Sequence, residues 1–191
     1  MYYSQTENKH ITEYTQFTLG GVTYPQQWLA QATPEQKAAI GLEEVVVTGS
    51  RADDRFYWVS ENLVGASLSY TNTPKLLDDR EEVDENGQPM YVKVLDNSDP
   101  ANPMMVDSDK RLVTKGLKSN TIAQIKQTAG SMLAQTDWMV VRAAEGIKPA
   151  PADVLAKREA IRAASNANEA AVLACTTVAE LAALQMTWPA E

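Results

Sequence analysis

Short alternating segments of apolar and polar residues fill the first part of the chain, and they predict β-strands. Residues 15–19 alternate, Gly20-Gly21 follows as a turn signal, and residues 22–24 complete a predicted β-hairpin. Residues 43–48 are rich in β-branched side chains and residues 56–59 in aromatic ones, so each is a predicted strand. The start of the chain is therefore expected to be β-rich.

Two short helices are expected between these strands. Trp28-Leu29 opens the first of them. The second has Thr33 as its N-cap, Pro34 at the first helical position, and Gln36 reaching back to complete a capping box. Gly41 is placed to end this second helix.

Residues 71–118 are the least hydrophobic part of the chain and contain an acidic run at residues 78–85. Asn86-Gly87 predicts a hairpin turn before an alternating strand at residues 90–95, and residues 104–106 are a candidate edge strand. The acidic run lacks the ligand spacing and the glycine of a calcium-binding loop. We therefore expect a solvated acidic loop that holds no metal.

From residue 119 onward the apolar spacing changes to three and four residues, which is typical of a helix with one buried face. Ser119 or Asn120 is the expected cap, Gly130 is a weak point, and Gly146 ends the helix. The residues expected to face the core are Ile122, Ile125, Ala129, Met132 or Leu133, Val140 and Ala143.

A second helix is expected over residues 152–174 and a third over residues 178–184, where Thr177 and Glu180 fit a capping box. The core candidates of the second helix are Val154, Leu155, Ile161, Ala164, Ala171 and Leu173. The predicted fold class is therefore α+β. A β-rich domain with a short helix is expected over residues 1–70, an acidic hairpin and loop region over 71–118, and a C-terminal bundle of about three helices over 119–191.

The net charge of −8 lies entirely in the first part of the chain. Residues 1–117 carry 10 Lys and Arg against 18 Asp and Glu, whereas residues 118–191 carry seven of each. Affinity for nucleic acids and for anionic membranes comes mostly from cationic side chains, so we expect neither as a partner. No apolar stretch approaches the roughly 20 residues of a membrane helix.

The residues that most often perform catalysis are scarce. Cys175 is the single cysteine and lies in an apolar helical context, so it is expected to be a buried filler. His10 is the single histidine and is expected on the solvated surface, without a neighbouring nucleophile motif. Phosphate-binding glycine loops are also missing. We expect no enzyme, no cofactor and no metal.

One segment of the helical part resembles a known family. Residues 132–142, Met-Leu-Ala-Gln-Thr-Asp-Trp-Met-Val-Val-Arg, are followed by a proline-rich break at residues 149–153 and by Arg158-Glu-Ala-Ile-Arg162. This order resembles phage tail assembly chaperone and tail-fibre assembly domains, which carry a Leu, Thr/Ser-Asp-Trp and Arg pattern, a break, and an R-x-x-I/L-R stretch. Trp188-Pro189 also resembles the end of such chains.

The first part of the chain adds to this resemblance. Residues 24–29, Tyr-Pro-Gln-Gln-Trp-Leu, are followed by Thr33-Pro-Glu35 and by Ala39-Ile-Gly41, which together resemble the opening of small phage tail-fibre-associated proteins. Residues 54–58, Asp-Arg-Phe-Tyr-Trp, resemble a later motif of the same proteins. The acidic region carries no such resemblance.

The resemblance implies a structural or assembly protein of a tailed-phage tail, acting by protein–protein contacts at the baseplate or tail fibre. It would be found in the virion tail, or in the host cytoplasm during assembly, and repeated or oligomeric in a symmetric assembly. Two versions stay open, one an adaptor or hinge that remains in the virion and the other a chaperone that leaves.

The candidate partner-binding residues are Trp138, Arg142, Asp137, Trp58 and Tyr57. The alternative for the helical set is that Thr136, Asp137 and Trp138 only determine the fold, the first two by restarting or capping the helix near Gly130 and Trp138 by anchoring the helix packing. Glu145 shares the helical face of Arg142, and structural ion pairing or helix capping is the role expected of these charged residues.

Two other function classes remain as alternatives. In the first, Tyr57, Trp58 and Tyr70 of the β-rich part bind a carbohydrate on the host surface. In the second, the chain is a cell-wall hydrolase that uses Glu61 or Asp79, which the scarcity of catalytic residues disfavours.

Overall fold

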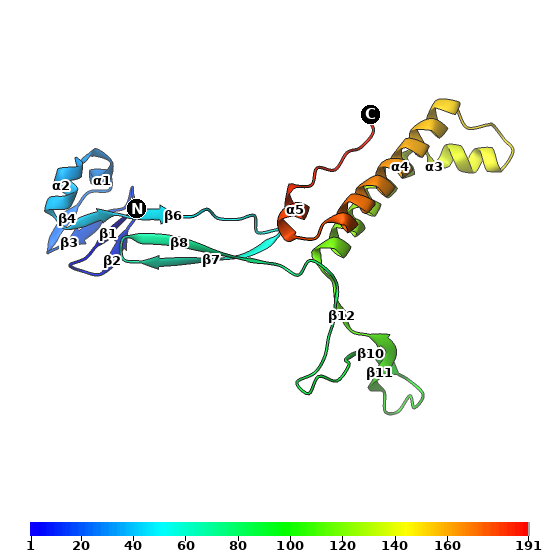
Figure 1. Cartoon of the computed structure of the whole chain (residues 1–191), viewed down its shortest axis with the longest axis horizontal. Coiled ribbons are helices and arrows are strands. Elements are labelled where there is room, and N and C mark those ends of the chain that lie inside the picture. The colour runs from blue at the N-terminus through cyan, green and yellow to red at the C-terminus, as the bar shows by residue number, and fades with distance from the viewer. Residues whose placement is uncertain (191) are drawn as a thin grey trace. The chain divides into compact units, whose positions relative to one another are not determined.

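The structure is a computed structural model that describes residues 1–190, and it combines a strand-rich N-terminal part with a helical C-terminal region (Figure 1). The mixed α+β class expected from the sequence is confirmed at this level. The chain forms two compact units, Met1–Thr73 and Pro74–Glu191. The acidic segment belongs to the second unit from Pro74 on.

The first unit opens with a three-stranded antiparallel sheet. Strand β1 (Tyr2–Ser4) lies in the middle, between β2 (Lys9–Ile11) and β5 (Leu42–Glu44). The predicted hairpin follows as β3 (Phe17–Leu19) and β4 (Val22–Tyr24), and this prediction is confirmed. The side chains buried between these elements and α1 are Tyr2, Ile11, Phe17, Leu19, Leu29 and Leu42.

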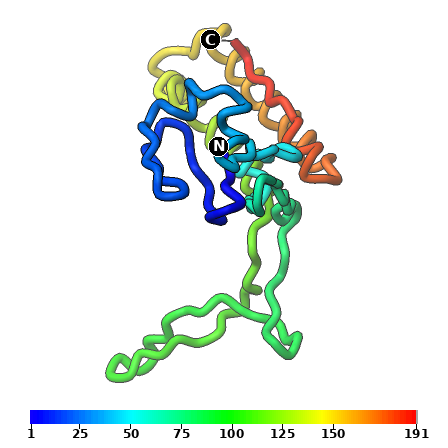
Figure 2. The backbone as a smooth tube through the Cα atoms, turned by 90° about the vertical axis from the view of Figure 1, so that its left-hand side faces the viewer, coloured from blue at the N-terminus to red at the C-terminus, as the bar shows by residue number. Residues whose placement is uncertain are grey.

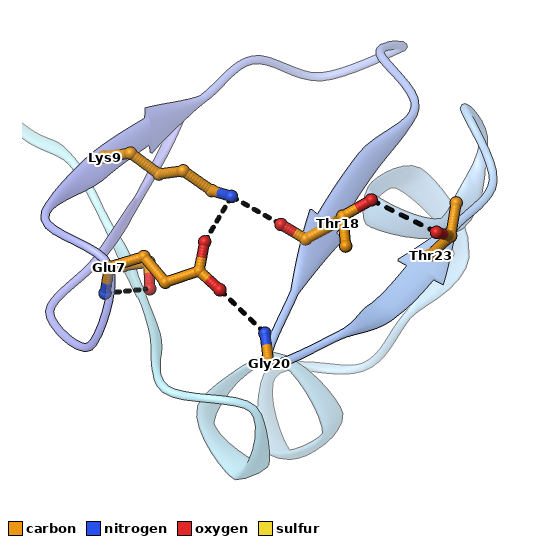
Figure 3. A network of polar contacts seen from close by, with 6 residues as sticks. Glu7, Lys9, Thr18, Gly20 and Thr23 are labelled. Atoms are coloured by element: carbon orange, nitrogen blue, oxygen red, sulfur yellow. Dashed lines mark hydrogen bonds and ion pairs between the residues drawn. The ribbon is translucent and has the colours of Figure 1, made fainter.

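A polar network fastens the hairpin to the first sheet (Figure 3). The Glu7 carboxylate accepts a hydrogen bond from Lys9 Nζ at 2.5 Å and from the Gly20 backbone N–H at 2.7 Å. Lys9 also donates to the carbonyl of Thr18. The contacts with Lys9 and with Gly20 lower the pKa of Glu7. Gly20 has a φ of +56°, a conformation that the tight turn requires and that glycine adopts at little cost.

Both short helices of this unit form as expected. Helix α1 (Trp28–Gln31) places Trp28 against Tyr24, with ring centroids 4.8 Å apart. Helix α2 (Pro34–Ala39) has the predicted capping box, since Thr33 Oγ1 accepts from the Gln36 N–H at 3.3 Å and Gln36 Oε1 accepts from the Thr33 N–H at 2.8 Å.

The strand predicted over residues 43–48 is instead divided between two sheets. Val45 separates β5 from β6 (Val46–Thr48) in the chain, and its side chain is buried. Strand β6 runs parallel to β8 (Ser67–Pro74). Strand β7 (Tyr57–Val64) completes this second sheet in the order β6-β8-β7. The predicted aromatic strand at residues 56–59 is therefore the start of a longer one.

His10 is partly buried, so the prediction of a solvated surface histidine is wrong. It lies on β2, its Nε2 is 2.8 Å from the Gly65 carbonyl oxygen, and its ring centroid is 5.1 Å from that of Tyr3. These contacts give His10 a structural position in the first unit.

The second unit begins with two pairs of strands. Strand β9 (Arg80–Glu81) pairs with β12 (Val113–Thr114), and β10 (Tyr91–Asp96) pairs with β11 (Met104–Arg111). Figure 2 shows these segments running side by side away from the start of the first long helix. The expected edge strand at residues 104–106 is longer than predicted because residues 107–111 continue the pairing with β10.

The acidic run is largely exposed, as expected of a solvated segment, and three of its carboxylates also pair with cations from later in the chain. Asp79 contacts Lys115 at 2.7 Å, Asp78 contacts Lys118 at 2.9 Å and Glu81 contacts Arg111 at 3.0 Å. These cations lie more than 25 residues further along the chain, so the ion pairs close the base of the strand region.

The helical region holds α3 (Leu117–Ala144), α4 (Ala152–Ala174) and the short α5 (Val178–Ala183). Helices α3 and α4 form an antiparallel hairpin (Figure 1). Helix α5 has the predicted capping box of Thr177 and Glu180. The chain after α5 is held at Thr187, whose backbone N–H and carbonyl bond the side chain of Asn168 at 3.2 and 3.0 Å.

The start of α3 differs from the prediction. The N-cap is Gly116, and neither Ser119 nor Asn120 has that role. The first two N–H groups of the helix, those of Leu117 and Lys118, donate to the carbonyls of Leu76 and Leu77 at 2.8 and 3.0 Å, and Asp79 Oδ1 accepts from the N–H of Gly116 at 2.9 Å. The contact with Lys115, followed by those with Ser119 and Gly116, lowers the pKa of Asp79 to about 2. The helix then runs through Gly130 without interruption.

The core of the second unit is small. Leu173, expected in the core, is 62% exposed, and Leu155 is also exposed, because α4 packs on one side only. Cys175 is buried as predicted. The buried apolar residues are Ile125, Ala129, Ile161, Val172, Cys175, Val178 and Leu181. Along residues 1–190, no helix is long and apolar enough to cross a membrane.

Candidate partner-binding site

The five candidate residues fall on two elements in different units. Asp137, Trp138 and Arg142 lie on α3, whereas Tyr57 and Trp58 lie on β7 of the first unit. The three helical candidates therefore lie close together on α3, and the two strand candidates lie on a different element of the other unit.

A buried arginine organises the α3–α4 interface around Asp137. Arg158 of α4 is only 6% exposed. Its Nη1 donates to the Leu133 carbonyl and to Thr136 Oγ1, both at 2.7 Å, and its Nη2 donates to Asp137 Oδ1 at 2.7 Å. A buried guanidinium is costly unless its donors are satisfied, so these three bonds hold the two helices in one register.

This cluster assigns a structural role to Thr136 and Asp137. Thr136 and Asp137 lie in the middle of α3, so the prediction that they restart or cap a helix near Gly130 is wrong. The side chain of Asp137 is still more than half exposed, so solvent screens part of the ion pair. Asp137 therefore fastens α4 to α3 through Oδ1 while most of its side chain stays exposed.

Arg158 was not among the predicted site residues, although the sequence carries a signal for it. It shares a helical face with the apolar residues Val154, Ile161 and Val172, since it lies four residues after Val154 and three before Ile161. A cation in the middle of such a face must have partners across the interface. The Thr-Asp and R-x-x-I-R segments of the resemblance are thus the two sides of one contact.

Trp138 and Arg142 form the exposed part of the site. The Trp138 side chain is 54% exposed and Arg142 lies over its ring, with the guanidinium carbon 4.9 Å from the ring centroid. Within the described part of the chain no ion pair joins Arg142 to Glu145, and Glu145 instead takes the expected alternative of helix capping, as the C-cap residue of α3. A cation–π pair of Trp and Arg on an exposed helix face has the composition of interface hot spots.

The strand candidates are less concentrated. Trp58 is 67% exposed on β7, while Tyr57 and Tyr70 are half-buried. Adjacent residues of a strand face opposite sides of the sheet, so Tyr57 and Trp58 cannot form one flat aromatic platform.

A second apolar surface lies on the strand pair β10–β11 and was missed by sequence reasoning. Leu95 pairs with Met105 and Val94 with Val106 across the two strands, and Leu95, Met104 and Met105 are each more than half exposed. An isolated two-stranded ribbon is marginally stable in water, and this one has an apolar pair on each face. Such a surface is suited to a protein partner.

The cavity between α3 and α4 is too small for a typical small-molecule ligand. Its volume is about 90 Å³, against roughly 300–1,000 Å³ for sites that bind such ligands. The residues that line it are Met132, Gln135, Thr136, Asp153, Val154, Lys157, Arg158 and Ile161.

The acids considered for hydrolysis have structural partners. Asp79 pairs with Lys115 and its lowered pKa keeps it ionised, which is unsuitable for a general acid near neutral pH. Glu61 lies 3.7 Å from Arg51. Over residues 1–190, no group of three or more His, Cys, Asp or Glu residues is placed to hold a metal ion.

The accessible surface of the chain is large for its mass. It measures 12,945 Å². A compact chain of 20.9 kDa exposes about 9,000 Å², and two separately compact units of these sizes expose about 11,000 Å². The remainder, about 2,000 Å², comes from elements that each unit leaves uncovered.

In comparisons with protein-family models, curated proteins and solved structures, no match to this chain was found.

Proposed function

We propose that this chain is a non-catalytic structural or assembly protein of a tailed-phage tail. It acts through protein–protein contacts at the baseplate or tail fibre, in the virion tail or in the host cytoplasm during assembly. Support comes from the resemblance of residues 119–191 and from the contact of Thr136 and Asp137 with Arg158, which gives the two segments that carry the resemblance a shared structural role.

The observation that carries the proposal is the uncovered surface of the second unit. Helix α3 has 28 residues but buries only Ile125 and Ala129. The β10–β11 ribbon exposes Leu95, Met104 and Met105. Elements of this kind gain stability when a partner covers them, and proteins that act by assembly present such surfaces.

We further propose that α3, α4 and α5 act as one small helical bundle. Val178 and Leu181 of α5 are buried, and Asn168 of α4 holds the chain after α5 at Thr187. The bundle positions Trp138 and Arg142, and the acidic first part contributes no affinity for nucleic acid.

The direct test is deletion of the gene from the phage genome that carries it, followed by electron microscopy of the particles. Heads of normal appearance with tails that lack fibres or baseplate parts are expected. Particles with complete tails would rule the proposal out.

Mass spectrometry of purified wild-type particles then separates the two versions. A stoichiometric presence of the chain supports the adaptor or hinge, whereas absence from particles together with defective tails after deletion supports the chaperone.

One observation favours a second candidate function, the recognition of a host-surface carbohydrate. Trp58 is 67% exposed on β7, and exposed indole rings stack on sugars. A glycan array probed with the full chain and with Trp58→Ala decides this point. Binding lost in the variant would support a carbohydrate module, and no binding by the wild-type chain would eliminate it.

A further inference from the structure

The segment that follows α5, residues 184–190, is extended and is not paired with any strand (Figure 1). Leu184 has a φ of −68° and a ψ of 128°, which are values of an extended backbone. Over residues 185–190, no backbone–backbone hydrogen bond joins this segment to another described residue. The segment, here termed the strap, therefore depends on side chains for its position.

The exposure of the strap alternates along its length. Leu184, Met186 and Trp188 are half-buried, whereas Gln185 and Thr187 are exposed. Successive side chains of an extended chain point to opposite sides, so one side of the strap is partly covered and the other faces solvent. Extended peptides bound to protein surfaces have this pattern, with alternate side chains in contact with the surface.

A single side chain of α4 binds the backbone of the strap. Asn168 is only 4% exposed, and its Nδ2 donates to the Thr187 carbonyl at 3.0 Å while its Oδ1 accepts from the Thr187 N–H at 3.2 Å. The amide thus pairs its donor and its acceptor with both polar groups of one residue. The contact selects an extended backbone and makes no demand on the Thr187 side chain, which faces solvent.

Asparagine is an unusual residue at this position of α4. Asn168 shares the buried face of the helix with Ile161 and Val172, where an apolar side chain is the ordinary choice. A buried amide is unfavourable unless its donor and its acceptor are both bonded. Among the described residues, the side chain of Asn168 bonds Thr187 alone. The helix therefore carries a buried group whose partner is an extended backbone.

We propose that the surface of α4 at Asn168 is a binding site for extended peptides with apolar side chains at every second position, and that the strap is its resident ligand. Because Thr187 alone is hydrogen-bonded within residues 185–190, the strap opens while the helices stay folded. An open strap frees the site for another segment of the same chemistry. This site is independent of the proposed phage function.

The strap competes with any added peptide from within the chain. A ligand on a short flexible tether acts at an effective concentration in the millimolar range. An added peptide with a Kd of about 100 µM is therefore expected to bind at least about tenfold more weakly while the strap is closed. The wild-type chain hides the site, and a chain with a weakened strap reveals it.

Hydrogen exchange of the wild-type chain tests the opening of the strap. After correction for intrinsic rates, the Thr187 N–H is expected to exchange at least about tenfold more slowly than the unbonded Gln185 N–H. It is expected to exchange at least about tenfold faster than the N–H of Ile161, within α4. Exchange of Thr187 as slow as that of Ile161, or as fast as that of Gln185, would overturn the proposal.

Binding of a synthetic peptide with the sequence of residues 184–190 tests the site itself. The full chain with Thr187→Pro lacks the strap N–H that bonds Asn168, so it is expected to bind the peptide at least about tenfold more tightly than the wild-type chain. The matched control is Thr187→Ala, which keeps this N–H and is expected to bind like the wild type. Adding Asn168→Ala to Thr187→Pro is expected to abolish binding.

Circular dichroism confirms that each variant retains its helices before binding is measured. Absence of peptide binding to a folded Thr187→Pro chain would overturn the proposal. Equal binding by Thr187→Pro and the wild-type chain, or binding that survives Asn168→Ala, would overturn it as well.

Discussion

The two sides of helix α3 differ in what holds them. The inward side is fastened by Arg158, which bonds the Leu133 carbonyl, Thr136 and Asp137 across the interface with α4. The outward side carries Trp138 and Val141 in an exposed strip. Residues 132–142 thus hold the fold together on the inward side of the helix and are available for contact on the outward side. Substitutions on the two sides should separate stability from association.

The largest effect is expected from Arg158→Ala. The substitution leaves the three oxygens that accept from Arg158 without their donor, and it opens a cavity between the helices. Because the Asp137 end of the cluster is screened by solvent, we expect a loss of about 2–3 kcal/mol rather than that of a fully buried pair. Chemical denaturation measures it. Arg162→Ala, on the exposed side of the same helix, is the control and should change stability by less than about 0.5 kcal/mol.

Gly116, the N-cap residue of α3, lies against neighbouring backbone, whereas Gly130 within the helix has open space around it. A Cβ at Gly116 would lie 2.5 Å from the backbone of Asp78, so Gly116→Ala should destabilise by about 1–3 kcal/mol. Gly130→Ala has open space and a better helix former, so dilute protein should gain about 0.5–1 kcal/mol. Equal destabilisation by both substitutions would contradict this difference.

Trp138→Ala should have a small effect on the stability of dilute protein, below about 1 kcal/mol, because the side chain is 54% exposed. Thermal unfolding at low concentration measures it. A loss as large as that of Arg158→Ala would mean that Trp138 anchors the fold and is not part of a contact surface.

The smallest effect is expected from pH, at the base of the strand region. The pKa of Asp79 falls from 3.8 to about 2 on folding, so its stabilising contribution is complete above pH 4 and is lost as pH drops toward 2. Unfolding curves between pH 5 and 2 should show this loss, and Asp79→Asn should flatten the profile. An unchanged profile in the variant would show that other carboxyl groups determine acid stability.

Local signals in the sequence predicted local structure well. The turn at Gly20-Gly21 and the capping boxes at Thr33 and Thr177 each depend on residues within four positions, and all three form as expected.

Contacts between distant residues were not predictable in this way. Asp79 bonds the N-cap residue Gly116 from 37 residues away, and Arg158 bonds partners more than 20 residues back in the chain. Leu155 and Leu173 were assigned to the core because their spacing fits a helix buried more widely than α4 is. Spacing shows which residues share a face but not how much of that face a neighbour covers.

Complementation of a gene-deleted phage by Trp138→Ala tests the central claim most directly, with Leu173→Ala as the matched control. The account predicts that Trp138→Ala is folded and as stable as the control, yet restores few complete tails by electron microscopy and few plaques. Full restoration by Trp138→Ala would show that the outward side of α3 is not the working surface of this protein.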